Sequence, residues 1–203
     1  MKNIIEIGSN DGSHTIGFLG NTNVWCFEPN PLYVNVLKNK FKENKNVNII
    51  QKAVSDFNGI SFFNIASDGL SSSLNELTQF ANQNSKIKYV DKILVDVIRM
   101  DEFLNQNKIN CVDYFHCDAQ GEDFKILKSF GEKISIIKRG KVEVSLFEDL
   151  YLNSFNYIDD VINFLKENDF DIINSSEIQL FKKSLKRYDI DVQFCKKNIK
   201  RFI

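Results

Sequence analysis

The sequence lacks both a long apolar run and a strong excess of charge. No segment approaches the roughly 20 apolar residues that a membrane-spanning helix requires. Glu6 and the glycines that follow it interrupt the apolar stretch that a signal peptide would need at the N-terminus. The formal net charge of -1 gives the chain no global field to attract nucleic acid or anionic lipid. We therefore expect a cytoplasmic protein with no membrane insertion and no nucleic-acid partner.

Cysteine is also scarce, and no two cysteines form a CxxC pair. The four cysteines are Cys26, Cys111, Cys117 and Cys195, which fall in or beside predicted strands. Without the paired spacing of a metal or redox centre, they are expected to be reduced and buried thiols. The cysteine pattern therefore predicts no metal site.

The chain of 203 residues has 43% hydrophobic and 26% charged residues, which is typical of one globular domain covering 1–203. Apolar runs predict strands at 3–7, 24–28, 47–53, 60–65, 92–98, 112–118, 141–146, 170–173 and 190–194. Helical patterns predict helices at 12–19, from 31 onward, at 100–107, after 118 and at 158–168. The polar segment 66–85 is expected to be a long loop. This alternation predicts an α/β fold with a mainly parallel sheet.

The helix that begins at Pro31 has a clear start signal. Pro31 suits the first turn of a helix, and Asn30 before it is a good N-cap residue. We expect its buried face to carry four apolar residues, namely Leu32, Val36, Leu37 and Phe41.

A glycine-rich turn follows the first strand, with the pattern Glu6-x-Gly8-x-Asn10-x-Gly12. Such a turn lets backbone approach a nucleotide-like ligand closely. The glycines stand four residues apart and an acid precedes them, unlike the GxGxxG of dinucleotide sites. The carboxylate would repel a pyrophosphate and attract a cationic ligand, which favours S-adenosylmethionine over NAD. A plain strand-to-helix turn is the alternative interpretation of this motif.

A second acid, Glu28, stands at the end of the second predicted strand. It follows Gly8 by 28 − 8 = 20 residues. Nucleotide-binding sheets place at this offset the carboxylate that accepts hydrogen bonds from ribose hydroxyls. The alternative is a solvated acid at a strand end.

Five segments in order resemble the motifs of the FkbM-type methyltransferases. They are IEIGSNDGSHT, FEPNP, KAVSDFNG, SSSL and VDYFHCDAQGEDFKIL, and the resemblance runs from about Ile4 to Glu143. It implies the class I, Rossmann-like methyltransferase fold: a mainly parallel seven-stranded sheet with one antiparallel strand and helices on both faces. It also implies S-adenosylmethionine as cofactor and O-methylation of a hydroxyl on a sugar, a glycan or a related small molecule.

The resemblance also implies roles for individual residues. The methionine end of the cofactor would be held by Glu6, Gly8, Ser9, Asn10 and Gly12. The ribose would lie against Glu28 and Pro29, and the adenine against Ala53 and Val54. Asp118 would lie between cofactor and acceptor. The sequence departs from the family pattern KxDxEGxE, because His116 replaces the lysine, Gln120 the first glutamate and Asp123 the second.

Methyl transfer to a hydroxyl is an SN2 reaction in which the hydroxyl must also lose a proton. Asp118, at the tip of a predicted strand, is the best placed base or acceptor-positioning group. His116 lies two residues earlier on the same strand face and is the second candidate. It is equally well interpreted as a histidine satisfied within the sheet. Glu143, in a later strand, is a third acid that could reach the site.

Three other functions are compatible with parts of the pattern. Gln120, and a chain that begins at the first strand, would suit a binding or scaffold protein that kept the fold without catalysis. An NAD(P)-dependent oxidoreductase would need a turn that tolerates phosphate, which Glu6 argues against. An RNA methyltransferase would need a basic groove, which the charge balance does not indicate. Neither the acceptor nor the oligomeric state follows from the sequence.

Overall fold

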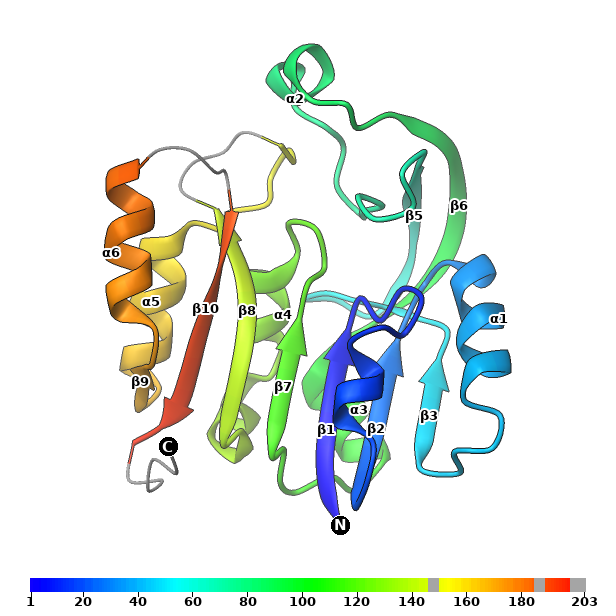
Figure 1. Cartoon of the computed structure of the whole chain (residues 1–203), viewed down its shortest axis with the longest axis vertical. Coiled ribbons are helices and arrows are strands. Elements are labelled where there is room, and N and C mark those ends of the chain that lie inside the picture. Colours follow the sequence, from blue (N-terminus) through cyan, green and yellow to red (C-terminus); the bar gives the residue numbers. More distant parts are fainter. Residues whose placement is uncertain (146–149, 185–188, 198–203) are drawn as a thin grey trace.

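The computed structural model describes residues 1–145, 150–184 and 189–197. Its main feature is a seven-stranded sheet (Figure 1). In spatial order, the strands are β3 (Val47–Ile50), β2 (Thr22–Phe27), β1 (Lys2–Ile7), β7 (Tyr114–Cys117), β8 (Arg139–Ser145), β10 (Asp189–Lys196) and β9 (Phe170–Ile172).

The sheet is parallel except at one strand. β1 lies parallel to β2 and β7, and β8 continues parallel to β7. β10 is antiparallel to both of its neighbours, β8 and β9. The predicted seven-stranded sheet with one antiparallel strand is confirmed for the residues that the structure describes. Leu146, the predicted end of the strand now seen as β8, lies outside those residues.

β1 lies near the centre of this sheet and is buried on both faces. Ile4, Ile5 and Ile7 are all buried, as expected for a parallel strand covered by helices on both sides. Glu6 is the exception in this apolar strand, because its charged side chain is only 1% exposed. A carboxylate at that depth needs polar partners.

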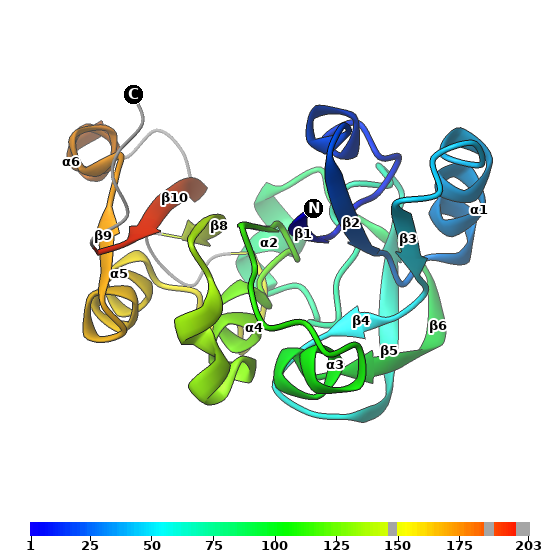
Figure 2. The same ribbon diagram turned by 90° about the horizontal axis from the view of Figure 1, so that it is seen from below.

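Helices cover both faces of the sheet (Figure 2). One face carries α3 (Met100–Gln106), α4 (Asp123–Ser129) and α5 (Ile158–Glu167), and the other carries η1 (Thr15–Phe18), α1 (Pro31–Lys40) and α6 (Ser175–Ser184). A second short 3-10 helix, η2 (Gly131–Ile136), follows α4. The helix predicted at 12–19 is shortened to η1, because Gly12 adopts a left-handed backbone (φ +74°) that a helix cannot contain.

α1 begins as predicted, but it buries a different face. The Asn30 side chain accepts a hydrogen bond from the Leu32 amide at 3.0 Å, which confirms the N-cap. Leu32 is 64% exposed, whereas Val34 is buried together with Leu37 and Phe41. The helix packs beside β3, at the edge of the sheet. Only a narrow stripe of its apolar residues is therefore buried, whereas a wider buried face was expected.

Two predicted strands form a separate small sheet instead of joining the main one. This sheet has the order β4 (Ala53–Val54), β6 (Tyr89–Ile98), β5 (Gly59–Ala66). β5 and β6 form a long antiparallel arm that rises beyond the main sheet (Figure 1). The segment predicted as a loop, 66–85, contains a short helix, α2 (Gln79–Asn84), at the end of this arm.

The largest core cluster lies between the main sheet and the helices α3, α4 and α5. Phenylalanines fill much of it, with Phe27, Phe115, Phe130, Phe170 and Phe194 fully buried. All four cysteines are free, and three of them are buried. Among the described residues, every helix is too short or too polar to cross a membrane.

Candidate active site

A cavity of about 700 Å³ lies at the carboxyl ends of the central parallel strands. It is lined from β1 by Ile7 and the turn that follows, from β2 by Phe27 and Glu28, and from β4 by Ala53 and Val54. The loop after β5 and the loop after β7 also line it, together with Tyr33 of α1 and Phe63 of β5. Ligands of open α/β sheets bind at this edge, where the strand order reverses direction. The volume suits a ligand of drug-like size.

The turn after β1 brings backbone from two strands very close together. Gly8 has a φ of +77°, and a Cβ at this position would lie 2.0 Å from the carbonyl oxygen of Asp118. Gly12 has a φ of +74°, and a Cβ there would meet the Phe41 ring at 2.6 Å. Both positions therefore require glycine for the backbone angle and for the space. Gly8 lines the cavity, whereas Gly12 packs behind the turn against α1.

Glu28 holds this turn from the end of β2. Its Oε2 accepts a hydrogen bond from the Asn10 amide at 2.9 Å, and its Oε1 accepts one from the Asn30 amide at 2.8 Å. Burial raises the pKa of Glu28 to about 7, although the two amide donors act in the opposite direction. A carboxylate has about four acceptor positions, so these two bonds leave capacity for further donors from the cavity.

The loop after β5 covers the cavity and is tied to the glycine turn. The Asn10 side chain donates a hydrogen bond to the Gly69 carbonyl at 2.7 Å. Gly69 itself packs against α1, where a Cβ would lie 2.0 Å from the Tyr33 hydroxyl. Asp68 accepts hydrogen bonds from the Leu70 and Ser71 amides, both at 3.0 Å, which fixes the loop conformation. The covering loop is thus held in place from both sides.

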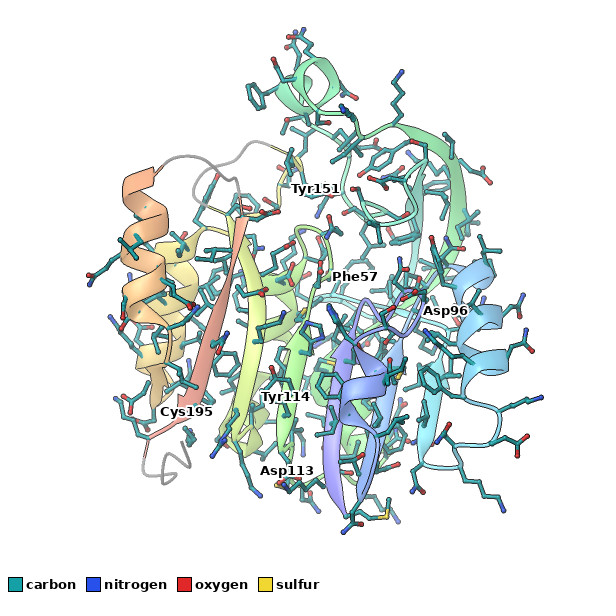
Figure 3. All side chains as sticks on the ribbon, viewed as in Figure 1. Phe57, Asp96, Asp113, Tyr114, Tyr151 and Cys195 are labelled. Atoms are coloured by element: carbon teal, nitrogen blue, oxygen red, sulfur yellow. The ribbon has the colours of Figure 1, made fainter. Side chains whose placement is uncertain are left out.

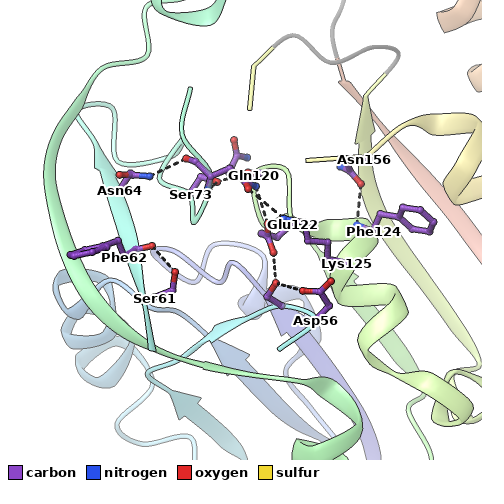
Figure 4. A network of polar contacts seen from close by, with 12 residues as sticks. Asp56, Ser61, Phe62, Asn64, Ser73, Gln120, Glu122, Phe124, Lys125 and Asn156 are labelled. Carbon is purple, nitrogen blue, oxygen red and sulfur yellow. Dashed lines mark hydrogen bonds and ion pairs between the residues drawn. The ribbon is translucent and has the colours of Figure 1, made fainter. Parts of the chain in front are cut away.

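Glu122 is a lining residue that sequence reasoning missed. It is 3% exposed and lies at the start of α4. It accepts hydrogen bonds from Ser55 and from the Asn75 side chain, and it pairs with Lys125 at 2.5 Å (Figure 4). Glu122 therefore joins the small sheet, the covering loop and α4. Asn75 and Ser55 are 47 and 67 residues away from Glu122 in sequence, and no local pattern would have indicated them.

Asp118 lies on the cavity wall, where Gln120 orients it. The Gln120 amide donates to Asp118 Oδ1 at 2.7 Å and to Glu143 Oε2 at 3.5 Å. Its own oxygen accepts a hydrogen bond from the Tyr151 hydroxyl at 2.6 Å. Tyr151 lies beyond the carboxyl ends of the strands (Figure 3) and was not predicted. A neutral amide thus bridges two carboxylates at the position where the family pattern has a glutamate.

Two neighbouring acids lie deeper than Asp118. Burial, and then repulsion from Asp118, raises the pKa of Glu143 well above its ordinary value, and Glu143 is not among the lining residues. Asp123 is fully buried; burial and then Asp118 raise its pKa to about 7. Its Oδ1 accepts a hydrogen bond from the Ala119 amide at 3.2 Å, whereas its Oδ2 has no hydrogen-bond partner within the described part of the chain. Asp118 is therefore the most accessible carboxylate of this group.

The structure places Glu6 and His116 together, but away from the cavity lining. Glu6 Oε1 lies 3.7 Å from His116 Nδ1, and Glu6 Oε2 accepts a hydrogen bond from the Thr15 hydroxyl at 2.5 Å. Side chains alternate along a strand, so Glu6 faces η1 while Ile7 faces the cavity side. The cavity lining does include Ser9, Asn10, Pro29, Ala53 and Val54. The roles of all these residues remain predictions.

Fold and cavity together define the class of protein. A seven-stranded sheet with one antiparallel strand, helices on both faces and a cavity at the carboxyl ends beside an acid is the arrangement of class I S-adenosylmethionine-dependent methyltransferases. The model of one family, described as the methyltransferase FkbM domain, matches residues 6–172. The chain therefore belongs to the FkbM methyltransferase family, whose cofactor is S-adenosylmethionine.

Solved structures with this fold include the FkbM methyltransferase from Methylobacillus flagellatus KT, with a TM-score of 0.56, 14% identity, and coverage of 95% of this chain and 43% of that one. The chain thus spans less than half of that protein. SMU.1697c from Streptococcus mutans, in complex with SAH, has a TM-score of 0.51 and 12% identity. The match covers 97% of this chain and 89% of that one. M. capricolum TrmK, in complex with S-adenosyl-homocysteine, has a TM-score of 0.50 and 10% identity. The match covers 97% of this chain and 62% of that one. These likenesses concern the fold alone. No curated protein matches the sequence significantly.

Proposed function

We propose that this chain transfers a methyl group from S-adenosylmethionine to a hydroxyl of a sugar, a glycan or a related small molecule. The observation that carries this proposal is the position of Asp118, a carboxylate on the cavity wall directly beside the glycine turn. A carboxylate within reach of an acceptor hydroxyl can take its proton or align it for attack. Membership of the FkbM family supports a hydroxyl acceptor.

The cavity offers features that fit each part of the cofactor. Gly8, Ser9 and Asn10 present backbone on one wall, where the methionine end would lie. Glu28 retains acceptor capacity for the two ribose hydroxyls, with Pro29 beside it. Apolar groups from Ala53 and Val54 would cover the adenine. Glu6 and Gly12 would affect cofactor binding indirectly, because they support the residues that form the turn after β1.

When bound, the cofactor would supply a methyl group on a sulfonium, which is already activated for attack. The protein then has to hold the acceptor oxygen in line and to receive its proton. Gln120 keeps Asp118 oriented for that task through the 2.7 Å hydrogen bond. Glu143, and His116 beside Glu6, are the other candidate bases, but neither lines the cavity. We also propose a cytoplasmic location, which the four free cysteines support.

Labelled methyl transfer into host-cell extract tests this function. Wild-type protein should label a carbohydrate fraction, and Asp118→Asn should retain affinity for S-adenosylhomocysteine while losing about 100-fold or more of turnover. Asp96→Asn is the control, because this acid is exposed on β6 and its ion-pair partner among the described residues is Lys52, at 3.1 Å.

Three outcomes would contradict the proposal in different ways. Normal turnover in Asp118→Asn would remove Asp118 from the mechanism. Cofactor binding with no labelled product would favour the non-catalytic alternative. Labelled RNA would mean that the acceptor is RNA and not a sugar, a glycan or a related small molecule.

A further inference from the structure

Both histidines of the chain lie at one place in the fold. The sequence contains only two, His14 and His116, which are 116 − 14 = 102 residues apart. His14 precedes η1 and His116 lies on β7, yet their rings meet edge to face with centroids 4.9 Å apart. Glu6 of β1 completes the group, and one donor atom from each of the three residues lies within 4.8 Å of the others.

Two of these three side chains are buried without enough partners. Glu6 is 1% exposed and His116 is 3% exposed. Glu6 Oε1, His116 Nδ1 and His116 Nε2 make no hydrogen bond with any residue that the structure describes. A buried polar atom without a partner is costly, and its presence in a native structure calls for an explanation. Glu6 Oε1 and His116 Nδ1 lie 3.7 Å apart, and His14 lies beside them, so a single ion between these side chains could serve as a partner for one atom of each.

The surroundings orient Glu6 in a way that is familiar from metal sites. Thr15 donates to Glu6 Oε2 at 2.5 Å, and the Cys26 thiol lies 3.7 Å from the same oxygen. These contacts occupy one carboxylate oxygen and leave Oε1 directed at His116. Outer hydrogen bonds of this kind fix the orientation of ligating carboxylates. The side chain is therefore preorganised to present a single free oxygen.

We propose that Glu6, His14 and His116 bind a divalent transition metal ion of the zinc class. Two imidazole nitrogens and one carboxylate oxygen are a donor set that such ions accept, and three protein ligands leave one position of a tetrahedral ion open. Two ligand atoms of a tetrahedral zinc lie roughly 3.3 Å apart. The 3.7 Å between Glu6 Oε1 and His116 Nδ1 is close to that spacing. His14 is exposed and can turn to complete the set.

The site would lie at the edge of the cavity, because His14 and Ser13 belong to its lining while Glu6 and His116 lie behind it. A bound ion would join β1, η1 and β7 directly behind the glycine turn. The cysteine pattern predicted no metal site because none of the three ligands is a cysteine, and His116 lies about a hundred residues after the other two. The proposal does not depend on the identity of the methyl acceptor.

Titration of the purified, chelator-treated chain with Co²⁺, followed by its visible absorption, tests the proposal. Wild-type protein should bind one ion per chain, and Zn²⁺ should displace it. His14→Ala should weaken binding by roughly tenfold or more. Because His14 is exposed, this variant should remain folded. Ser13→Ala is the matched control, since it alters the same loop without removing a ligand, and it should bind like the wild type.

Glu6→Gln is the second variant, and its circular dichroism shows whether the buried substitution is tolerated. If Glu6→Gln folds, it should also lose Co²⁺ affinity. If it does not fold, His14→Ala decides the matter alone. The proposal would be overturned if the wild-type protein bound neither Co²⁺ nor Zn²⁺, or if His14→Ala bound Co²⁺ with wild-type affinity. Glu6 and His116 would then be a buried pair of neighbouring side chains without a metal ion. Binding of S-adenosylhomocysteine, measured on the same samples, separates this result from failure of the proposed function.

Discussion

Cofactor affinity should depend on pH through Glu28. Burial raises the pKa of this carboxyl to about 7 in the free protein, so a proton is bound there below that pH. Two ribose hydroxyls need a carboxylate that accepts both of their hydrogen bonds, and the ionised form does this best. Binding must then release the proton, and affinity falls by up to about tenfold for each pH unit below 7. Between pH 8 and pH 5.5 the Kd should rise by roughly 30-fold.

Glu28→Gln removes the titrating group at this position. The amide is neutral at every pH and keeps a single acceptor oxygen, and its NH2 group would face one of the amides of Asn10 and Asn30. The loss of one or two charge-assisted hydrogen bonds, at about 1.5–3 kcal/mol each, weakens binding at pH 8 by roughly tenfold or more. The variant should therefore bind weakly, and with a Kd that does not change with pH.

Isothermal titration with S-adenosylhomocysteine, from pH 5.5 to 8.5, measures both effects. Asp96→Asn serves as the control and should reproduce the wild-type profile. A wild-type Kd that stays constant over this range would refute the role of the Glu28 carboxylate. The same slope in Glu28→Gln would assign the pH dependence to another group.

Two further predictions concern stability. Gly8→Ala places a Cβ 2.0 Å from the Asp118 carbonyl oxygen at a φ of +77°, and should lower the free energy of unfolding by about 3 kcal/mol in urea denaturation. Unchanged stability would mean that the two strands do not approach as described. Asp123 has a pKa of about 7 in the folded protein against 3.8 for an ordinary aspartate, so the folded state binds more protons between these values. The contribution of Asp123 to the free energy of unfolding should fall by up to about 4 kcal/mol as pH rises from 4 to 7, and then level off. Burial also raises the pKa of Glu28 and of Glu143, which add slopes of the same sign, so Asp123→Asn should remove only the share of Asp123; an undiminished slope in that variant would exclude Asp123 as a contributor.

The features that sequence reasoning found are those with local signals. Gly8 and Gly12 mark positive φ angles within one short turn, and the offset from Gly8 to Glu28 reflects one strand-helix-strand unit. Both sets of observations depend on residues close in sequence. The alternation of strands and helices and the N-cap at Asn30 followed in the same way, whereas the single antiparallel strand was expected only from the resemblance to the FkbM-type methyltransferases.

The features that it missed depend on contacts between distant segments. Glu122 meets Ser55 and Asn75 only because the small sheet folds over α4, and Tyr151 meets Gln120 across 31 residues. A charge argument placed Glu6 against the cofactor, but the alternation of side chains along β1 directs it toward η1 instead. Amphipathic patterns identified helix α1, but not which of its faces the edge of the sheet would cover.

The reaction that we propose is methylation of a carbohydrate oxygen at the cavity beside Asp118. Its most direct test is the chemical identity of the product labelled from S-adenosylmethionine in host-cell extract. Wild-type protein should form a product with the labelled methyl group bonded to a sugar oxygen, and this product should be nearly absent with Asp118→Asn. A labelled methyl group on nitrogen, on carbon or in RNA, or equal labelling by both proteins, would contradict it.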